Sequence, residues 1–94
     1  MLTMKWGTLE DGAQLMGMAE WDGGQYLYVG NYSEDSRSWS VQLGEFFEDK
    51  ETNVVKLFSG FASPDEAVLA VRDYLIEISG EQSSQVARRG SGRP

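Results

Sequence analysis

Polar segments at regular intervals are the feature that most constrains the fold of this chain. They are rich in Asp, Gly, Ser or Asn, and they are Glu10–Gly12, Trp21–Gly24, Ser33–Ser38 and Glu48–Asn53. Asp-Gly, which occurs in the first two, is a strong hairpin signal because Gly accepts the positive φ that tight hairpin turns require. Short segments separated by such turns favour an antiparallel meander of β-strands.

The segments between these turns have the residue patterns of β-strands. Trp39, Val41 and Leu43 alternate with polar Ser40 and Gln42. This is the two-residue period of a strand that buries one face. The predicted strands are Leu2–Leu9, Ala13–Glu20, Gln25–Tyr32, Trp39–Phe47 and Val54–Phe61.

The segment at residues 8–21 admits a second interpretation. Its residues are good helix formers, and Thr8 is a suitable helix cap. However, Gly12 and Gly17 would each cost about 1 kcal/mol in a helix interior. A strand is therefore favoured here, and a helix stays open as the alternative.

The clearest single element is a helix between Ser63 and Gly80. Ser63 suits the N-cap and Pro64 the first helical position. Glu66 completes a capping box, and Gly80 is a natural C-terminal stop. The apolar stripe comprises Ala67, Ala70, Val71, Tyr74, Leu75 and Ile78, with Val68 at its margin. The fold class is therefore α+β: an antiparallel four- to five-stranded meander with one C-terminal helix packed on one face.

Two apolar residues of this helix, Leu69 and Ile76, fall on the side opposite the stripe. We expect both to face solvent, because the stripe is the side that packs on the sheet. Exposed apolar pairs of this kind mark contact surfaces. Leu69 and Ile76 are therefore a candidate second interface, for example in a homodimer.

The chain is predicted to form one domain followed by a tail. Its 94 residues suit a single domain, which is expected to comprise residues 1–81. From residue 82 onward Val86 is the only large apolar side chain, while Arg88, Arg89 and Arg93 add positive charge. Residues 82–94 are therefore predicted to be a disordered basic tail.

The chain contains no cysteine and no histidine, and this restricts its chemistry. It lacks the thiolate nucleophile, the commonest general base and the commonest metal ligand. The sequence also has no phosphate-binding glycine loop and no nucleophile elbow. No apolar run reaches the roughly 20 residues that span a bilayer. We therefore expect a cytoplasmic, non-enzymatic protein with no catalytic residues, no cofactor and no metal site.

The charge is divided unevenly along the chain. Residues 1–84 carry fifteen acidic and five basic side chains, a net charge of −10, whereas residues 85–94 carry three arginines. A body of this charge repels nucleic-acid phosphates and suits a protein partner with a basic surface. Acidic turns that only keep a small protein in solution are the other interpretation.

Tyrosines in the third predicted strand indicate a docking surface. Tyr26, Tyr28 and Tyr32 share one side of the strand, and Leu27 and Val29 lie on the other. We expect the aliphatic pair to lie under the helix and the tyrosines to face outward, where such rings contribute to binding hot spots. The predicted partner-binding site is completed by the acidic side chains Glu34, Asp35, Glu48 and Asp49. Tyrosines that only cover the sheet, or that mediate dimerisation, are alternatives.

Two stretches of the sequence resemble RNA-recognition domains. "LYVGNYSED" resembles the opening strand and loop of such a domain, and "FSGFASPDEAVLAV" resembles the end of its third strand and the start of its second helix. The resemblance implies a nucleic-acid-binding module, in which exposed aromatic rings stack on bases. It also implies a helix between the two stretches, within Trp39–Phe47.

A second resemblance covers roughly residues 54–86. The sequence "SPDEA", followed by "VRDYL" and "SGE", resembles the closing helix of mostly-β immunity proteins from bacterial polymorphic-toxin systems. Phage inhibitors of bacterial defence nucleases, such as anti-CRISPR proteins, share the same short acidic profile. The resemblance to immunity proteins and the profile shared with phage inhibitors both imply a non-enzymatic inhibitor that binds and occludes a toxin or a nuclease complex.

Overall fold

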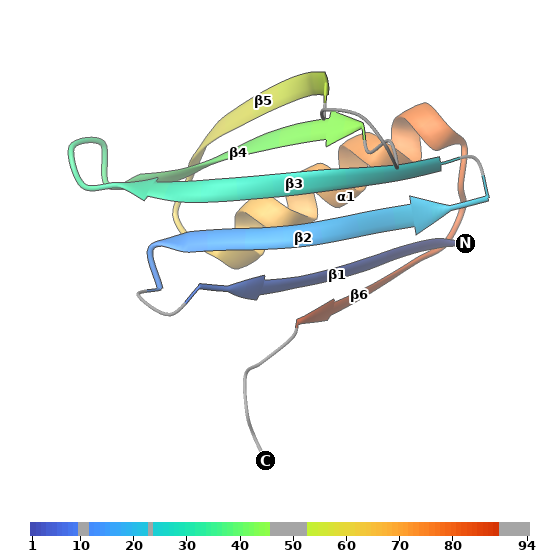
Figure 1. Ribbon diagram of the computed structural model, residues 1–94, viewed down its shortest axis with the longest axis horizontal. Coiled ribbons are helices and arrows are strands. Elements are labelled where there is room, and N and C mark those ends of the chain that lie inside the picture. The colour runs from blue at the N-terminus through green and yellow to red at the C-terminus, as the bar shows by residue number, and fades with distance from the viewer. Residues whose placement is uncertain (10–11, 23, 46–52, 89–94) are drawn as a thin grey trace, which may run out of the picture.

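The protein folds as a six-stranded sheet with one helix on one face (Figure 1). The computed structural model describes residues 1–9, 12–22, 24–45 and 53–88. Within these residues the elements are β1 (Leu2–Thr8), β2 (Gln14–Trp21), β3 (Gly24–Ser33), β4 (Ser38–Glu45), β5 (Asn53–Phe61), α1 (Pro64–Ser79) and β6 (Ser84–Arg88). The strand order across the sheet is β5-β4-β3-β2-β1-β6. The predicted α+β class is confirmed.

The first five strands form the antiparallel meander that the turn spacing predicts. Each strand pairs with the next one in the chain, from β1 with β2 to β4 with β5. The strand ends at Leu2 and Phe61 are as predicted, and the other described ends differ from the predicted ones by one or two residues. Phe46 and Phe47 of the predicted fourth strand lie outside the described residues. The ambiguous segment at residues 8–21 contributes β2, so the strand interpretation is confirmed there.

The sixth strand was not predicted, and the expected tail is wrong for residues 84–88. β6 pairs with β1 in parallel, from Leu2 opposite Ser84 to Trp6 opposite Arg88. Val86 packs against the core, and the Arg88 guanidinium lies 4.8 Å from the Trp6 ring centroid. The domain therefore extends past residue 81. The free edge of β1 offers unpaired backbone groups, so even a polar segment gains hydrogen bonds there. Residues 89–94 lie outside the described residues.

The helix α1 begins and ends as its sequence predicts. The Ser63 hydroxyl accepts a hydrogen bond from the Glu66 backbone N–H at 3.2 Å. Gly80 has a φ of 76°, and its N–H donates to the Ile76 carbonyl at 3.0 Å. No helix in the described part of the chain is long and apolar enough to cross a membrane.

The face that α1 buries differs from the predicted stripe near its C-terminal end. The buried residues are Ala67, Val68, Val71 and Leu75. Ile78 was expected inside but is 45% exposed, whereas Ile76 was expected outside but packs against the core. A sheet twists from strand to strand, so the side of a helix that touches it turns along the helix. The predicted exposed pair of Leu69 and Ile76 is therefore wrong for Ile76.

A bulge in β5 decides which of its side chains reach the core. Trp39 is opposite Phe61 and Ser40 is opposite Ser59, so Gly60 is an extra residue in β5. Its φ of 88° is one that glycine adopts readily. Phe58 and Phe61 consequently both pack against the core below α1. Leu57 is opposite Gln42 and faces the other side of the sheet. A second irregularity follows, because Leu43 is opposite Lys56 and Gly44 is opposite Val54, so Val55 is also an extra residue in β5.

Candidate functional site

The predicted orientation of β3 is wrong. Tyr28 is fully buried on the side covered by α1, and its hydroxyl donates to the Lys5 carbonyl oxygen at 3.3 Å. Burial raises the pKa of this hydroxyl well above its usual range. The ring fits there because its opposite residue in β2 is Gly17, which leaves room for it. Leu27 and Val29 therefore point to the side of the sheet opposite α1.

The other two tyrosines do not form a continuous surface either. Tyr26 is half-buried and stacks on Trp21, with ring centroids 5.2 Å apart and an interplanar angle of 11°. The pKa of Tyr26 is raised, first by burial and then by the nearby Glu45 carboxylate. Tyr32 is 39% exposed and tilts against Trp39. All three tyrosines lie on the helix side of β3, so they do not form the outward-facing row on the uncovered side of the sheet that was predicted.

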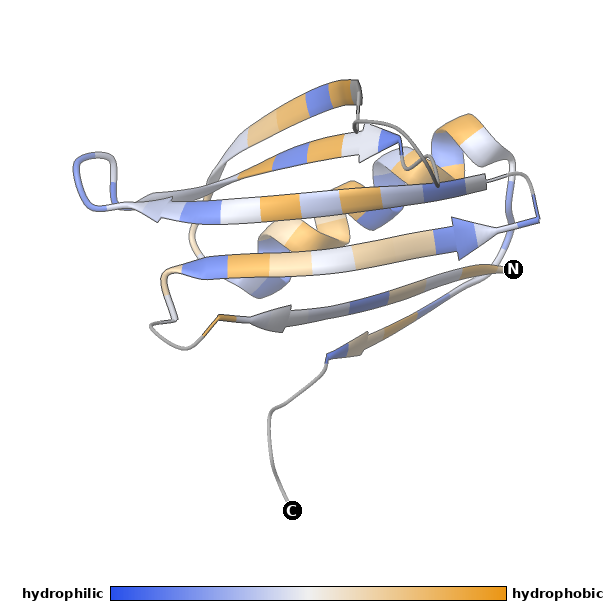
Figure 2. Ribbon diagram, viewed as in Figure 1, coloured by the Kyte–Doolittle hydropathy of each residue, from blue (hydrophilic) through white to orange (hydrophobic). Residues whose placement is uncertain are grey.

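The side of the sheet without the helix, which we call the open face, has an apolar centre. In Figure 1 α1 lies behind the sheet, and in Figure 2 hydrophobic positions recur along the central strands. Met16 and Leu57 are 52% and 69% exposed on this face. The apolar side chains of the open face are Leu9, Met16, Met18, Leu27, Val29, Val54 and Leu57.

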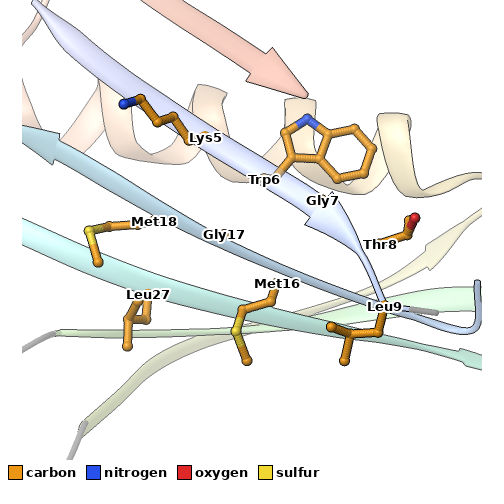
Figure 3. Close-up of a pocket in the computed structure, with 9 residues that line it drawn as sticks. All are labelled: Lys5, Trp6, Gly7, Thr8, Leu9, Met16, Gly17, Met18 and Leu27. Atoms are coloured by element: carbon orange, nitrogen blue, oxygen red, sulfur yellow. The ribbon is translucent and has the colours of Figure 1, made fainter. Parts of the chain in front are cut away.

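Two hollows lie on this face, one over β1, β2 and β3 and the other over β3, β4 and β5. The larger, of about 520 Å³, lies over β1, β2 and β3 between Lys5, Met18 and Leu27. Figure 3 shows Met16, Met18 and Leu27 pointing to this side of the sheet, whereas the Trp6 ring points toward the helix. The smaller, of about 290 Å³, is lined by residues that include Val29, Gln42 and Leu57. The open face is thus a contoured surface.

Charged side chains are scarce on the open face of the described strands. The strand alternation places only Lys5 and Glu20 there. Lys5 makes no ion pair with any described residue. The polar positions around the apolar centre are mostly amides, namely Gln14, Gln25, Asn31, Gln42 and Gln85. Gln14 donates to Asn31 and Gln25 donates to Glu20, each at 2.9 Å.

The predicted acidic site residues are only partly placed. Glu34 and Asp35 are exposed in the turn between β3 and β4. Glu48 and Asp49 lie outside the described residues. Leu69 is 42% exposed on α1, in the layer behind the sheet, so it does not join the open face.

Sequence reasoning missed the methionines of β2. Met16 and Met18 alternate with Leu15, Gly17 and Ala19, which are buried under α1. Both alternating sets of this strand are small or apolar, so periodicity alone does not say which set is covered. The signal that could have found them is Gly17, since a glycine in a strand often marks the close approach of a large side chain.

The described residues contain no group of three or more acidic side chains placed to hold a metal ion. The order of elements also differs from the one that the RNA-recognition resemblance implies. Residues 38–45 form β4, where that resemblance expects a helix. Comparison of the chain with protein-family models, with curated proteins and with solved structures found no match.

Proposed function

We propose that this protein is a non-enzymatic inhibitor that docks the open face of its sheet on a protein target and occludes it. The observation that carries the proposal is an exposed apolar centre with few charges on one whole side of the domain. Immunity proteins of toxin systems and phage inhibitors of defence nucleases act in this general way. We place its action in the cytoplasm.

The composition of the open face supports a protein partner. Protein interfaces have an apolar core in which methionine is enriched and charged residues are depleted, with a polar rim around it. Here Met16, Met18 and Leu27 form the centre, and amide side chains surround it. Burying apolar area contributes roughly 25 cal/mol per Å², so an exposed centre of this kind is a source of binding free energy.

The charge distribution supports a target with a basic rim. The acidic residues that the structure describes lie mostly on the turns and on α1, for example Glu34, Asp35 and Glu77. A field of this sign accelerates encounter with a basic surface, while the uncharged centre supplies the affinity. A nucleic acid is less well supported, because phosphates are repelled and the described open face presents no aromatic ring for stacking.

The test uses a toxic protein encoded beside this gene. It measures whether the present protein restores the growth of cells that express the toxic protein, and whether the two purified proteins bind. We expect co-expression to restore growth and the purified pair to bind with a negative heat-capacity change, the mark of apolar burial. Met16→Glu places a charge in the centre of the face and should abolish both effects. Leu69→Glu is the matched control, since Leu69 is similarly exposed on the opposite layer. The proposal is wrong if Met16→Glu binds like the wild type and Leu69→Glu does not.

A further inference from the structure

The strand β5 forms an edge of the sheet, and its outer side is a second candidate binding surface. β5 is the last strand in the sheet order and pairs only with β4 among the described residues. It is nine residues long, against five for β6 at the other edge. The backbone N–H and C=O groups that point away from β4 form a ready template for another strand.

The side chains of β5 do not protect this edge. Leu57, Val54 and Val55 are 69%, 52% and 37% exposed, and Leu57 is the most exposed of the large apolar side chains described. Edge strands are usually kept from pairing by charges, by proline, by shortness or by bulges. The irregularities of β5 lie at Val55 and Gly60, on either side of Leu57. β5 has no proline and no acidic residue, and Lys56 is its only charge. By contrast, β6 is short and ends at Arg88.

We infer that β5 pairs in antiparallel fashion with β5 of a second copy of this chain, with Leu57 on the two-fold axis. An axis perpendicular to the sheet places residues of the same face opposite each other. In this register Leu57 is opposite Leu57 of the second copy, and Val55 is opposite Ser59. The inference does not depend on the proposed function, because it concerns the edge of the sheet rather than its open face.

Charge and apolar matching favour this register over the two with the axis at Lys56 or at Val55. An axis at Lys56 would place two lysines directly opposite each other, and like charges in that position are destabilising. An axis at Val55 would leave the exposed Leu57 opposite Asn53. With the axis at Leu57, Lys56 is opposite Phe58 of the second copy. Within one copy the Lys56 ammonium lies 5.7 Å from the Phe58 ring centroid and 5.2 Å from the Tyr74 ring centroid. A lysine opposite Phe58 of the second copy is therefore compatible with further cation–π contact.

The arrangement leaves the rest of the molecule accessible. Both copies keep α1 on the same side of a continuous sheet, and both open faces lie together on the other side. The irregularities at Val55 and Gly60 limit the regular part of β5, so the pairing is confined to the residues from Val55 to Ser59. A second copy fits this edge because β5 contributes no negative charge, although the chain as a whole carries −7.

Single-cysteine variants test the inference directly, because the chain has no cysteine of its own. Residues directly opposite in antiparallel strands have Cα atoms about 4.5–5.5 Å apart, which a disulfide can bridge. Under mild oxidation Leu57→Cys should form a covalent dimer. Val55→Cys and Ser59→Cys should each stay monomeric alone, since like positions would then be roughly 13 Å apart, but should cross-link when mixed. Ser36→Cys, in the exposed turn between β3 and β4, is the control for random collision.

Analytical ultracentrifugation of the wild type should show a concentration-dependent doubling of mass, and Leu57→Lys should remove it. The inference is overturned if the wild type stays monomeric at its highest soluble concentration. It is also overturned if Leu57→Cys cross-links no faster than Ser36→Cys. Cross-linking of Met16→Cys instead would overturn it too, because that result indicates packing of the open faces. Met16→Glu should leave the dimer intact while it abolishes target binding. Sedimentation and target binding, measured on this variant, therefore test the dimer and the proposed function independently.

Discussion

A β-carbon on Gly17 would overlap the ring of Tyr28, the residue directly opposite it in the pairing of β2 with β3. The Tyr28 ring lies over the Gly17 backbone on the helix side of the sheet. This one relationship decides the orientation of β3. It places Tyr28 inside and leaves Leu27 and Val29 on the open face.

Gly17→Ala should therefore destabilise the fold, by at least about 1–3 kcal/mol, because the new methyl group must displace a packed ring. Urea denaturation measures the free energy of unfolding. The control is Gly24→Ala, since nothing lies within 4 Å of the added methyl group at Gly24. Tyr28→Leu should be less harmful in the Gly17→Ala background than in the wild type. Equal losses for Gly17→Ala and Gly24→Ala would contradict the close contact.

Tyr28 should make the fold sensitive to high pH. Its pKa is raised by burial from the ordinary 10.0, so above about pH 10 the unfolded chain releases a proton that the folded chain retains. The stabilising contribution is complete below pH 10 and falls at higher pH, by at most about 1.4 kcal/mol per pH unit. Tyr26 adds a similar dependence, because its pKa is also raised.

Denaturation of the wild type and of Tyr28→Phe at several alkaline pH values separates the two tyrosines. The variant should lose about 1 kcal/mol near neutral pH with the hydrogen bond to the Lys5 carbonyl. Its stability should then fall less steeply above pH 10 than that of the wild type. Parallel curves for the two proteins would show that Tyr28 does not titrate differently on folding.

The strand β6 should contribute measurably to stability. Val86→Ser removes a partly buried side chain that packs on the core, and we expect a loss of roughly 1 kcal/mol. Ala87→Ser is the matched control, because Ala87 is exposed on the other side of β6 and should change stability by less than about 0.5 kcal/mol. If both variants melt at the wild-type temperature, β6 does not hold Val86 against the core.

Oxidation of the open face should weaken target binding without unfolding the protein. Met16 is 52% exposed, and its sulfoxide would place a polar group in the apolar centre. Mild peroxide treatment should lower the affinity for the target about tenfold or more, as expected for losing roughly 1.4 kcal/mol of binding free energy. Met16→Leu should resist this loss, because leucine has no sulfur to oxidise. An equal loss in Met16→Leu would place the sensitive residue elsewhere.

Much of the fold could be predicted because its signals are local. The caps at Ser63 and Gly80 depend on side-chain and backbone groups within one turn of the helix, and they delimit α1. The turns rich in Asp and Gly separate the five strands of the meander. Gly17 argued for a strand rather than a helix in residues 8–21, and it lies in β2. The candidate site could not be predicted in the same way, because its location depends on which side of each strand is covered.

The sequence by itself determined most of the described strands from β1 to β5, the helix α1, the meander order of these strands and the acidic charge of the body. These follow from hydrogen-bonding and conformational preferences that act over a few neighbouring residues. Only the tertiary structure decided that Tyr28 lies inside, that β6 pairs with β1 and that methionines form the open face. In β3 both alternating sets contain large apolar groups, so strand periodicity allows either orientation. The space above Gly17, a residue on another strand, selects one of them.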